Sequence, residues 1–134
     1  TKAIEMAYLN LKKDKEKINE IKFYCIKSLK EIFNSIHFNG LSYNMNKSLY
    51  TILNVSLPLN NELLPIYLDL KGIAISQGSA CNSYKLSHVI KHLLDNKYNN
   101  HLKNNINIRI SFGIFNEKKD IDILIDILRK YIKK

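Results

Sequence analysis

Two stretches of alternating apolar and polar residues constrain the fold of this chain most. In residues 106–112 the isoleucines and Phe112 fall on one face of an extended chain, and Arg109 lies on the other face. Residues 50–57 alternate in a similar way, with Asn54 on the polar face. Because a half-buried strand has one apolar and one polar face, both stretches predict β-strands.

Helical patterns surround these strands. Residues 3–33 carry apolar side chains at helical spacing, and another helix is expected to begin near Asn116, which is a good N-cap residue. A shorter helix is expected over residues 61–71, residues 72–76 are expected to form a short buried strand, and residues 86–94 fit one helical face. The pattern predicts an α+β fold, a small mixed or antiparallel sheet with helices packed on it.

The same periodicity predicts which side chains are buried. Turns are expected at residues 38–40 and 42–46. The expected buried stripe of the first helix comprises Ala3, Ala7, Leu11, Ile18, Ile21, Cys25, Leu29 and Ile32. The expected stripe of the last helix comprises Ile121, Leu124, Ile125, Leu128 and Ile132.

Length and composition favour a single reduced, cytoplasmic domain. The chain has 134 residues, two cysteines and no recognisable secretion signal. No apolar run approaches the roughly 18 residues that a membrane span requires. It begins without Met and in mid-pattern, so we expect residues 1–134 to be one domain cut from a longer protein.

The net charge of +9 does not by itself predict nucleic-acid binding. Of the 21 basic residues, only Arg109 and Arg129 are arginine, whereas phosphate-reading surfaces favour the planar arginine fork. Lysine is abundant together with Ile and Asn, as expected from a coding bias towards A and T. A basic nucleic-acid module remains an alternative, which predicts steeply salt-dependent binding.

Cys81 is the first candidate for chemistry. It follows Gly78, Ser79 and Ala80, and a loop of such small residues can expose a thiol as a nucleophile or sulfur carrier. The alternative is a tight turn in which the cysteine has no function, and the local pattern leaves both interpretations open. Cys25 lies on the apolar face of the first helix, where cysteine behaves as a small hydrophobe.

Arg109 and two histidines are the other candidates. A guanidinium on the polar face of an apolar strand can hold a carboxylate through two hydrogen bonds, although an ordinary surface arginine fits the pattern equally well. His88 and His92 are four residues apart, a spacing that can bind a metal ion. No third ligand is evident, so no metal site is expected.

The order of several motifs resembles one family. These are "NVSL" at 54–57, "LDLKGIAISQGSACNS" at 68–83, "SHVI" at 87–90 and "IRISFG" at 108–113, followed by the helix start "NEKKDID". They are similar to the C-terminal part of cysteine desulfurases, which belong to the pyridoxal-phosphate-dependent class V aminotransferases. The form of the cysteine loop resembles the branch with a long mobile loop. The resemblance implies the small C-terminal domain of a fold-type I pyridoxal-phosphate enzyme.

The resemblance also implies a role for each candidate residue. Cys81 would accept sulfur from L-cysteine as a persulfide, leaving L-alanine, and could serve as a transient iron–sulfur ligand. Arg109 would bind the α-carboxylate of the substrate. The implied partners are an iron–sulfur scaffold protein or another sulfur acceptor, for cluster assembly and tRNA thiolation, and a second subunit in a homodimer.

The cofactor half of such an enzyme is not found in this sequence. No lysine lies in the family's Ser-Gly-His-Lys setting, so pyridoxal 5'-phosphate would be bound by a large domain outside this chain. We therefore expect this chain alone to bind no cofactor and to lack desulfurase activity. Two alternatives are a stand-alone sulfur-carrier domain without catalysis and a selenocysteine lyase-like enzyme.

Overall fold

The fold combines three described helices with a four-stranded sheet. A computed structural model describes residues 2–59, 63–77, 92 and 105–133. Its elements, in chain order, are α1 (Lys2–Ile32), β1 (His37–Phe38), β2 (Ile52–Leu57), α2 (Leu64–Asp69), β3 (Ser76–Gln77), β4 (Ile106–Ser111) and α4 (Lys118–Ile132). The expected helix over 86–94 and the loop containing Cys81 lie outside the described residues. In the described helices, no segment is long and apolar enough to cross a membrane.

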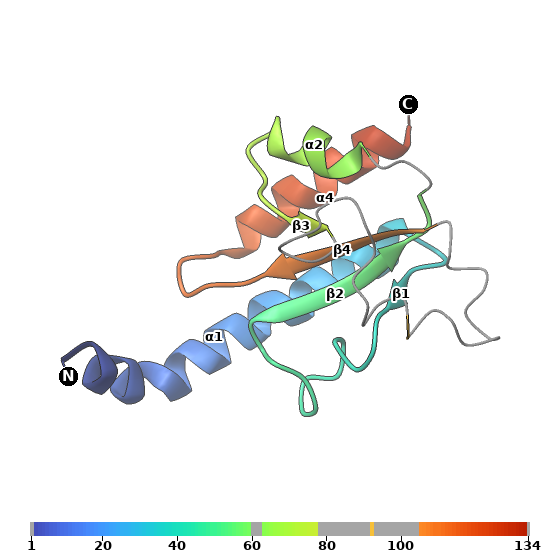
Figure 1. The fold of residues 1–134 in the computed structure, drawn as a ribbon. Coiled ribbons are helices and arrows are strands. Elements are labelled where there is room, and N and C mark those ends of the chain that lie inside the picture. The colour runs from blue at the N-terminus through green and yellow to red at the C-terminus, as the bar shows by residue number, and fades with distance from the viewer. Residues whose placement is uncertain (1, 60–62, 78–91, 93–104, 134) are drawn as a thin grey trace.

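The sheet is antiparallel throughout, with the strand order β1-β2-β4-β3 (Figure 1). The two predicted strands, β2 and β4, are its centre and pair over six residues each. Their register places Val55 opposite Ile108 and Asn54 opposite Arg109. Because directly paired residues project on the same side of a sheet, apolar and polar residues of the two strands are sorted onto opposite faces. The α+β prediction is confirmed in its antiparallel form.

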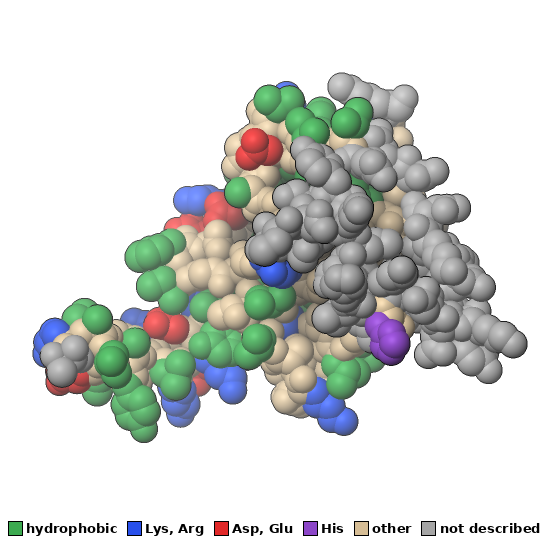
Figure 2. All heavy atoms as spheres, viewed as in Figure 1, with side chains coloured by type: hydrophobic (Ala, Val, Ile, Leu, Met, Phe, Trp, Pro, Cys, Tyr) green, Lys and Arg blue, Asp and Glu red, His purple; other side chains and the backbone are tan. Residues whose placement is uncertain are grey.

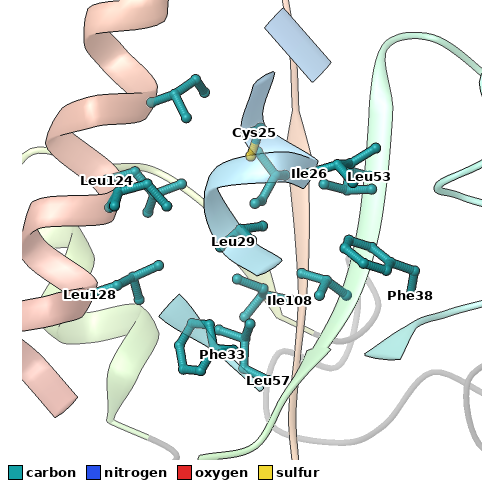
Figure 3. Close-up of a cluster of buried hydrophobic side chains, with 14 of the residues drawn as sticks. Cys25, Ile26, Leu29, Phe33, Phe38, Leu53, Leu57, Ile108, Leu124 and Leu128 are labelled. Carbon is teal, nitrogen blue, oxygen red and sulfur yellow. The ribbon is translucent and has the colours of Figure 1, made fainter. Parts of the chain in front are cut away.

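The core forms between the apolar face of the sheet and two helices. Figure 3 shows side chains of α1, such as Leu29, directed towards Leu128 of α4 and towards Leu53 and Ile108 of the sheet. Leu29, Leu53 and Leu128 are completely buried. The expected stripe of α4 is buried from Ile121 to Leu128, as the helical spacing predicted, but the predicted burial of Ile132 was wrong because it is 43% exposed. These contacts hold the sheet rigid from one side.

The first helix has two unlike halves. From Ile18 to Leu29 its expected stripe is buried, with Cys25 and Leu29 fully covered, whereas Ile32 is only partly buried. Residues 2–13 are exposed, and the helix extends away from the sheet there (Figures 1 and 2). The predicted burial of Ala3, Ala7 and Leu11 was therefore wrong for this chain. Periodicity identifies an apolar face but does not tell how far the packing partner extends.

Two local predictions around the sheet are corrected by the structure. The strand expected at 72–76 is instead the two-residue β3 at Ser76–Gln77, because Gly72 adopts a turn with φ +80° and ends the preceding helical segment. The turn expected at 38–40 begins later, since Phe38 pairs with Val55 in β1 and the left-handed φ of +59° falls at Gly40.

The last helix begins one residue later than predicted. Its N-cap is Glu117, whose backbone N–H donates to Asp120 Oδ2 at 3.0 Å. The predicted cap, Asn116, instead accepts a hydrogen bond from the backbone N–H of Gly113 through its Oδ1 atom, at 2.8 Å. The asparagine closes the turn between β4 and α4 rather than capping the helix. The predicted helix over 61–71 is described as α2, Leu64–Asp69.

Candidate functional site

The polar face of the sheet holds one of the candidate residues at its centre. Arg109 lies in the middle of β4, opposite Asn54 of β2 on one side and Ser76 of β3 on the other. The three side chains therefore form a row across three strands on the face that is opposite the helical core. Arg109 is exposed, as its polar-face position predicted.

The guanidinium of Arg109 is oriented by a neutral group. Its Nη2 atom donates a hydrogen bond to Ser76 Oγ at 3.2 Å. Within the described ranges, the ion pairs join Lys2 to Glu5 and Lys119 to Glu117, and none involves Arg109. Because a guanidinium has five N–H donors, most of them have no partner among the described residues. The arrangement suits a planar anion such as a carboxylate.

Three asparagines brace the same face beside Arg109. Asn39 donates through Nδ2 to Asn54 Oδ1 at 2.8 Å and to Asn107 Oδ1 at 2.9 Å. Asn39 and Asn107 are buried, so these hydrogen bonds form in a poorly hydrated setting, where they strengthen and specify one arrangement. Sequence analysis did not single out this cluster. The only signal was the polar positions of the alternating strands.

Two buried oxygen atoms on this side have no hydrogen-bond partner among the described residues. They are Asn39 Oδ1 and Ser56 Oγ. Ser56 is completely buried although it lies on the face opposite Leu53 and Leu57. The polar face is thus largely covered around Ser56 and Asn107 and exposed at Arg109. That contrast leaves Arg109 and Ser111 of β4 as exposed positions on this face.

Of the two cysteines, only Cys25 lies among the described residues. Cys25 has no exposed surface, and burial raises the pKa of its thiol to about 12. A buried neutral thiol is a poor nucleophile, so the structural interpretation of Cys25 is confirmed. Cys81 lies outside the described residues and stays a prediction. In the sequence it follows Ser76, the partner of Arg109, by five residues.

Pyridoxal phosphate finds no attachment point at the buried lysine of the described core. Its attachment requires a lysine amine open to the cofactor. The buried lysine of this core, Lys22, is not open: its Nζ donates to Ser48 Oγ at 2.9 Å and to the backbone carbonyl of Leu49 at 2.8 Å. Burial lowers the pKa of Lys22. We therefore assign no cofactor contact to Lys22.

No metal site is evident either. Within the described ranges, no group of three His, Cys, Asp or Glu residues could hold a metal ion. His92 is described and exposed, whereas His88 lies outside the described residues. The histidine pair is thus untested.

Comparison with known proteins decides the family. The model of the family described as aminotransferase class-V matches residues 1–124. The chain belongs to the class V aminotransferases. Among curated proteins, this class V chain is 31% identical over 139 residues to the cysteine desulfurase IscS of Dictyoglomus turgidum, with 99% of the chain aligned. It is also 31% identical over 134 residues to the cysteine desulfurase IscS of Clostridium botulinum (strain Hall).

The class V chain spans about a third of the length of these curated relatives, 33% in both cases.

Solved structures agree on the fold. A protein titled NifS-like aligns with a TM-score of 0.74 at 19% identity over 98% of this chain and 31% of its own. A NifS-like protein from Rickettsia africae aligns with a TM-score of 0.69 at 22% identity, over 93% of this chain and 31% of its own.

Proposed function

We propose that this chain is the C-terminal, substrate-binding part of a cysteine desulfurase, with Arg109 holding the α-carboxylate of L-cysteine. The observation that carries the proposal is the guanidinium of Arg109 on the accessible polar face of β4, where its hydrogen-bond partner among the described residues is the neutral Ser76 Oγ. The relatives named cysteine desulfurase support the choice of substrate.

The role of Arg109 follows from charge and geometry. Two parallel N–H donors of a guanidinium match the two oxygens of a carboxylate and fix its orientation as well as its position. The strand behind Arg109 is held by the core residues Ile108 and Ile110. A substrate carboxylate bound there would be positioned by the sheet rather than by a flexible segment.

Cys81 is proposed as the sulfur acceptor. Its thiol forms an S–S bond with the sulfur of L-cysteine while the carbon–sulfur bond of the substrate breaks. The carbon takes a proton and leaves as part of L-alanine, so that Cys81 becomes a persulfide with no added oxidant. The other thiol, Cys25, is excluded from this role by its complete burial and its raised pKa.

The remaining features of the proposal concern the whole protein. Pyridoxal phosphate, which supplies an electron sink for breaking the carbon–sulfur bond, would be held by residues outside this chain. We propose that the complete enzyme acts as a cytoplasmic homodimer and passes its sulfur to an iron–sulfur scaffold protein or a tRNA-thiolation acceptor. This chain alone would then be inactive.

The proposal is tested by product analysis of the full-length protein. Purified protein is incubated with pyridoxal phosphate and L-cysteine, and L-alanine is quantified for wild type and for Cys81→Ala. We expect alanine from the wild type and its loss in Cys81→Ala. The 134-residue chain is assayed beside them and is expected to form none.

A parallel assay with L-selenocysteine separates the nearest alternative. A selenocysteine lyase would release alanine from selenocysteine and little from cysteine. No alanine from cysteine with a folded, cofactor-loaded wild type would contradict the desulfurase proposal.

A further inference from the structure

The strand β3 is only two residues long, yet it places one hydroxyl at a specific point. Ser76 pairs with Arg109, and Gln77 pairs with Ile108. Side chains of directly paired residues project on the same face, with Cβ atoms about 5 Å apart. Ser76 is thus fixed beside Arg109 by backbone pairing and not by a flexible loop.

The contact between the two side chains is a hydrogen bond. Arg109 Nη2 donates to Ser76 Oγ at 3.2 Å, which directs the long arginine side chain towards β3. On the other side, Asn54 is the cross-strand partner of Arg109, but its Oδ1 atom accepts from Asn39 Nδ2. Among the described residues, Ser76 is therefore the group that sets the direction of the guanidinium.

A neutral partner suits this task better than a carboxylate would. An aspartate at position 76 would neutralise the arginine and compete with an incoming anion. The serine hydroxyl occupies one N–H donor and leaves the positive charge and the other donors for the ligand. Holding the side chain in place before binding also reduces the rotamer freedom that is lost when the ligand arrives.

We propose that Ser76 is a positioning residue for recognition of the substrate carboxylate, acting through Arg109. This inference rests on the proposed function of Arg109. Ser76 is also the first residue of β3, and Cys81 follows it five residues later in the sequence. The residue that orients Arg109 therefore lies shortly before the proposed sulfur acceptor.

The test uses the full-length enzyme loaded with pyridoxal phosphate. Ser76→Ala removes the hydroxyl, and Ser76→Thr keeps it on a side chain that strands tolerate well. Ser111→Ala is the matched control, because Ser111 lies two residues along β4 on the same face as Arg109 and has no hydrogen bond to it. Each variant is first checked for an unchanged melting temperature within a few degrees.

We expect Ser76→Ala to raise the KM for L-cysteine by about two- to ten-fold, the usual range for one net hydrogen bond. The kcat value should stay within about two-fold, because the lost interaction is made equally in the ground state and transition state. Ser76→Thr should restore the KM, and Ser111→Ala should leave it unchanged.

A pair of inhibitors shows whether the effect passes through the carboxylate. L-Alanine has the α-carboxylate, whereas ethylamine has the same carbon and nitrogen atoms without it. Ser76→Ala should weaken inhibition by L-alanine by the same factor as the KM and leave inhibition by ethylamine unchanged. Equal weakening of both inhibitors would overturn the inference, as would an unchanged KM or a defect that Ser76→Thr does not restore.

Failure of this inference can be told apart from failure of the proposed function. If wild type forms alanine and Arg109→Gln loses affinity for L-alanine while Ser76→Ala does not, the role of Ser76 is wrong and that of Arg109 stands. If wild type forms no alanine from cysteine, the proposed function fails, and the role of Ser76 in binding the substrate carboxylate fails with it.

Discussion

The two faces of the sheet are made by the same strands and have opposite properties. On one face, Leu53 and Val55 of β2 meet α1 and α4 with no exposed surface. On the other, Arg109 of β4 is exposed, and its hydrogen-bond partner among the described residues is a neutral hydroxyl. A shift of one residue in the register would exchange these faces. The apolar face therefore fixes the position of Arg109, and substitutions should separate stability from ligand binding.

The largest effect is expected on the apolar face. Leu53→Ala should lower the free energy of unfolding by about 2–5 kcal/mol, because the cavity left by a fully buried leucine is only partly refilled. Urea denaturation of this chain measures the loss in unfolding free energy. Ser111→Ala, on the exposed side of β4, should change the same quantity by no more than about 0.5 kcal/mol. Comparable losses for both variants would remove the distinction between the faces.

The next largest effect is expected on the polar face, where a substitution should weaken substrate binding without lowering stability. Arg109→Gln in the full-length enzyme should lower kcat/KM for L-cysteine about a hundredfold, which corresponds to two hydrogen bonds made by a charged donor. The melting temperature should stay close to that of wild type, since the side chain is exposed. Arg109→Lys should recover part of the loss through charge. A fully active Arg109→Gln would contradict the assignment.

A smaller effect is expected where the strand with Arg109 joins the last helix. Asp120 Oδ2 accepts from the backbone N–H of Glu117 and from Asn116 Nδ2, and these hydrogen bonds, in that order, lower the pKa of Asp120. Asp120→Ala should cost about 1 kcal/mol at neutral pH.

The sign of the pH dependence follows from the lowered pKa of Asp120. The folded chain binds this proton more weakly, so the stabilisation is complete above the unfolded pKa near 3.8 and is lost as pH falls through the folded value. The difference in unfolding free energy between wild type and Asp120→Ala should therefore shrink below about pH 4. A difference independent of pH would show that the ionised carboxylate is not the cap.

The smallest effect concerns Lys22, a fully buried lysine of α1. Burial lowers the pKa of Lys22 below its ordinary 10.5, so between the folded pKa and 10.5 the unfolded chain binds more protons. Stability should rise with pH across that window in wild type relative to Lys22→Met. Paired urea midpoints from pH 7 to pH 10.5 measure the difference. A constant difference would mean that Lys22 keeps its ordinary pKa in the fold.

Sequence patterns predicted the helices and strands whose position depends mainly on burying one apolar face. The alternation in β2 and β4 identified the sheet, and helical spacing identified α1 and α4, because burial of one face dominates there. Arg109 was found for the same reason: it is an arginine on the polar side of a strand. Its availability to a ligand could not be predicted, because that depends on which side chains approach it in the fold.

The features that the sequence did not reveal depend on contacts between distant segments. β1 and β3 have only two residues each, too few to show a period, and exist because β2 and β4 offer unpaired backbone edges. The hydrogen bond from Arg109 to Ser76 spans 33 residues of sequence. Lys22 could have been noticed, since it lies four residues after Ile18 on the buried stripe of α1.

The most direct test of the central claim is the intact mass of the full-length enzyme after reaction with L-cysteine in the presence of pyridoxal phosphate. Wild type, Cys81→Ala and Cys25→Ala are compared without reducing agent. We predict the mass of one added sulfur on wild type and on Cys25→Ala and none on Cys81→Ala, because Cys25 is fully buried. Sulfur retained on Cys81→Ala, or absent from a folded and cofactor-loaded wild type, would contradict the account.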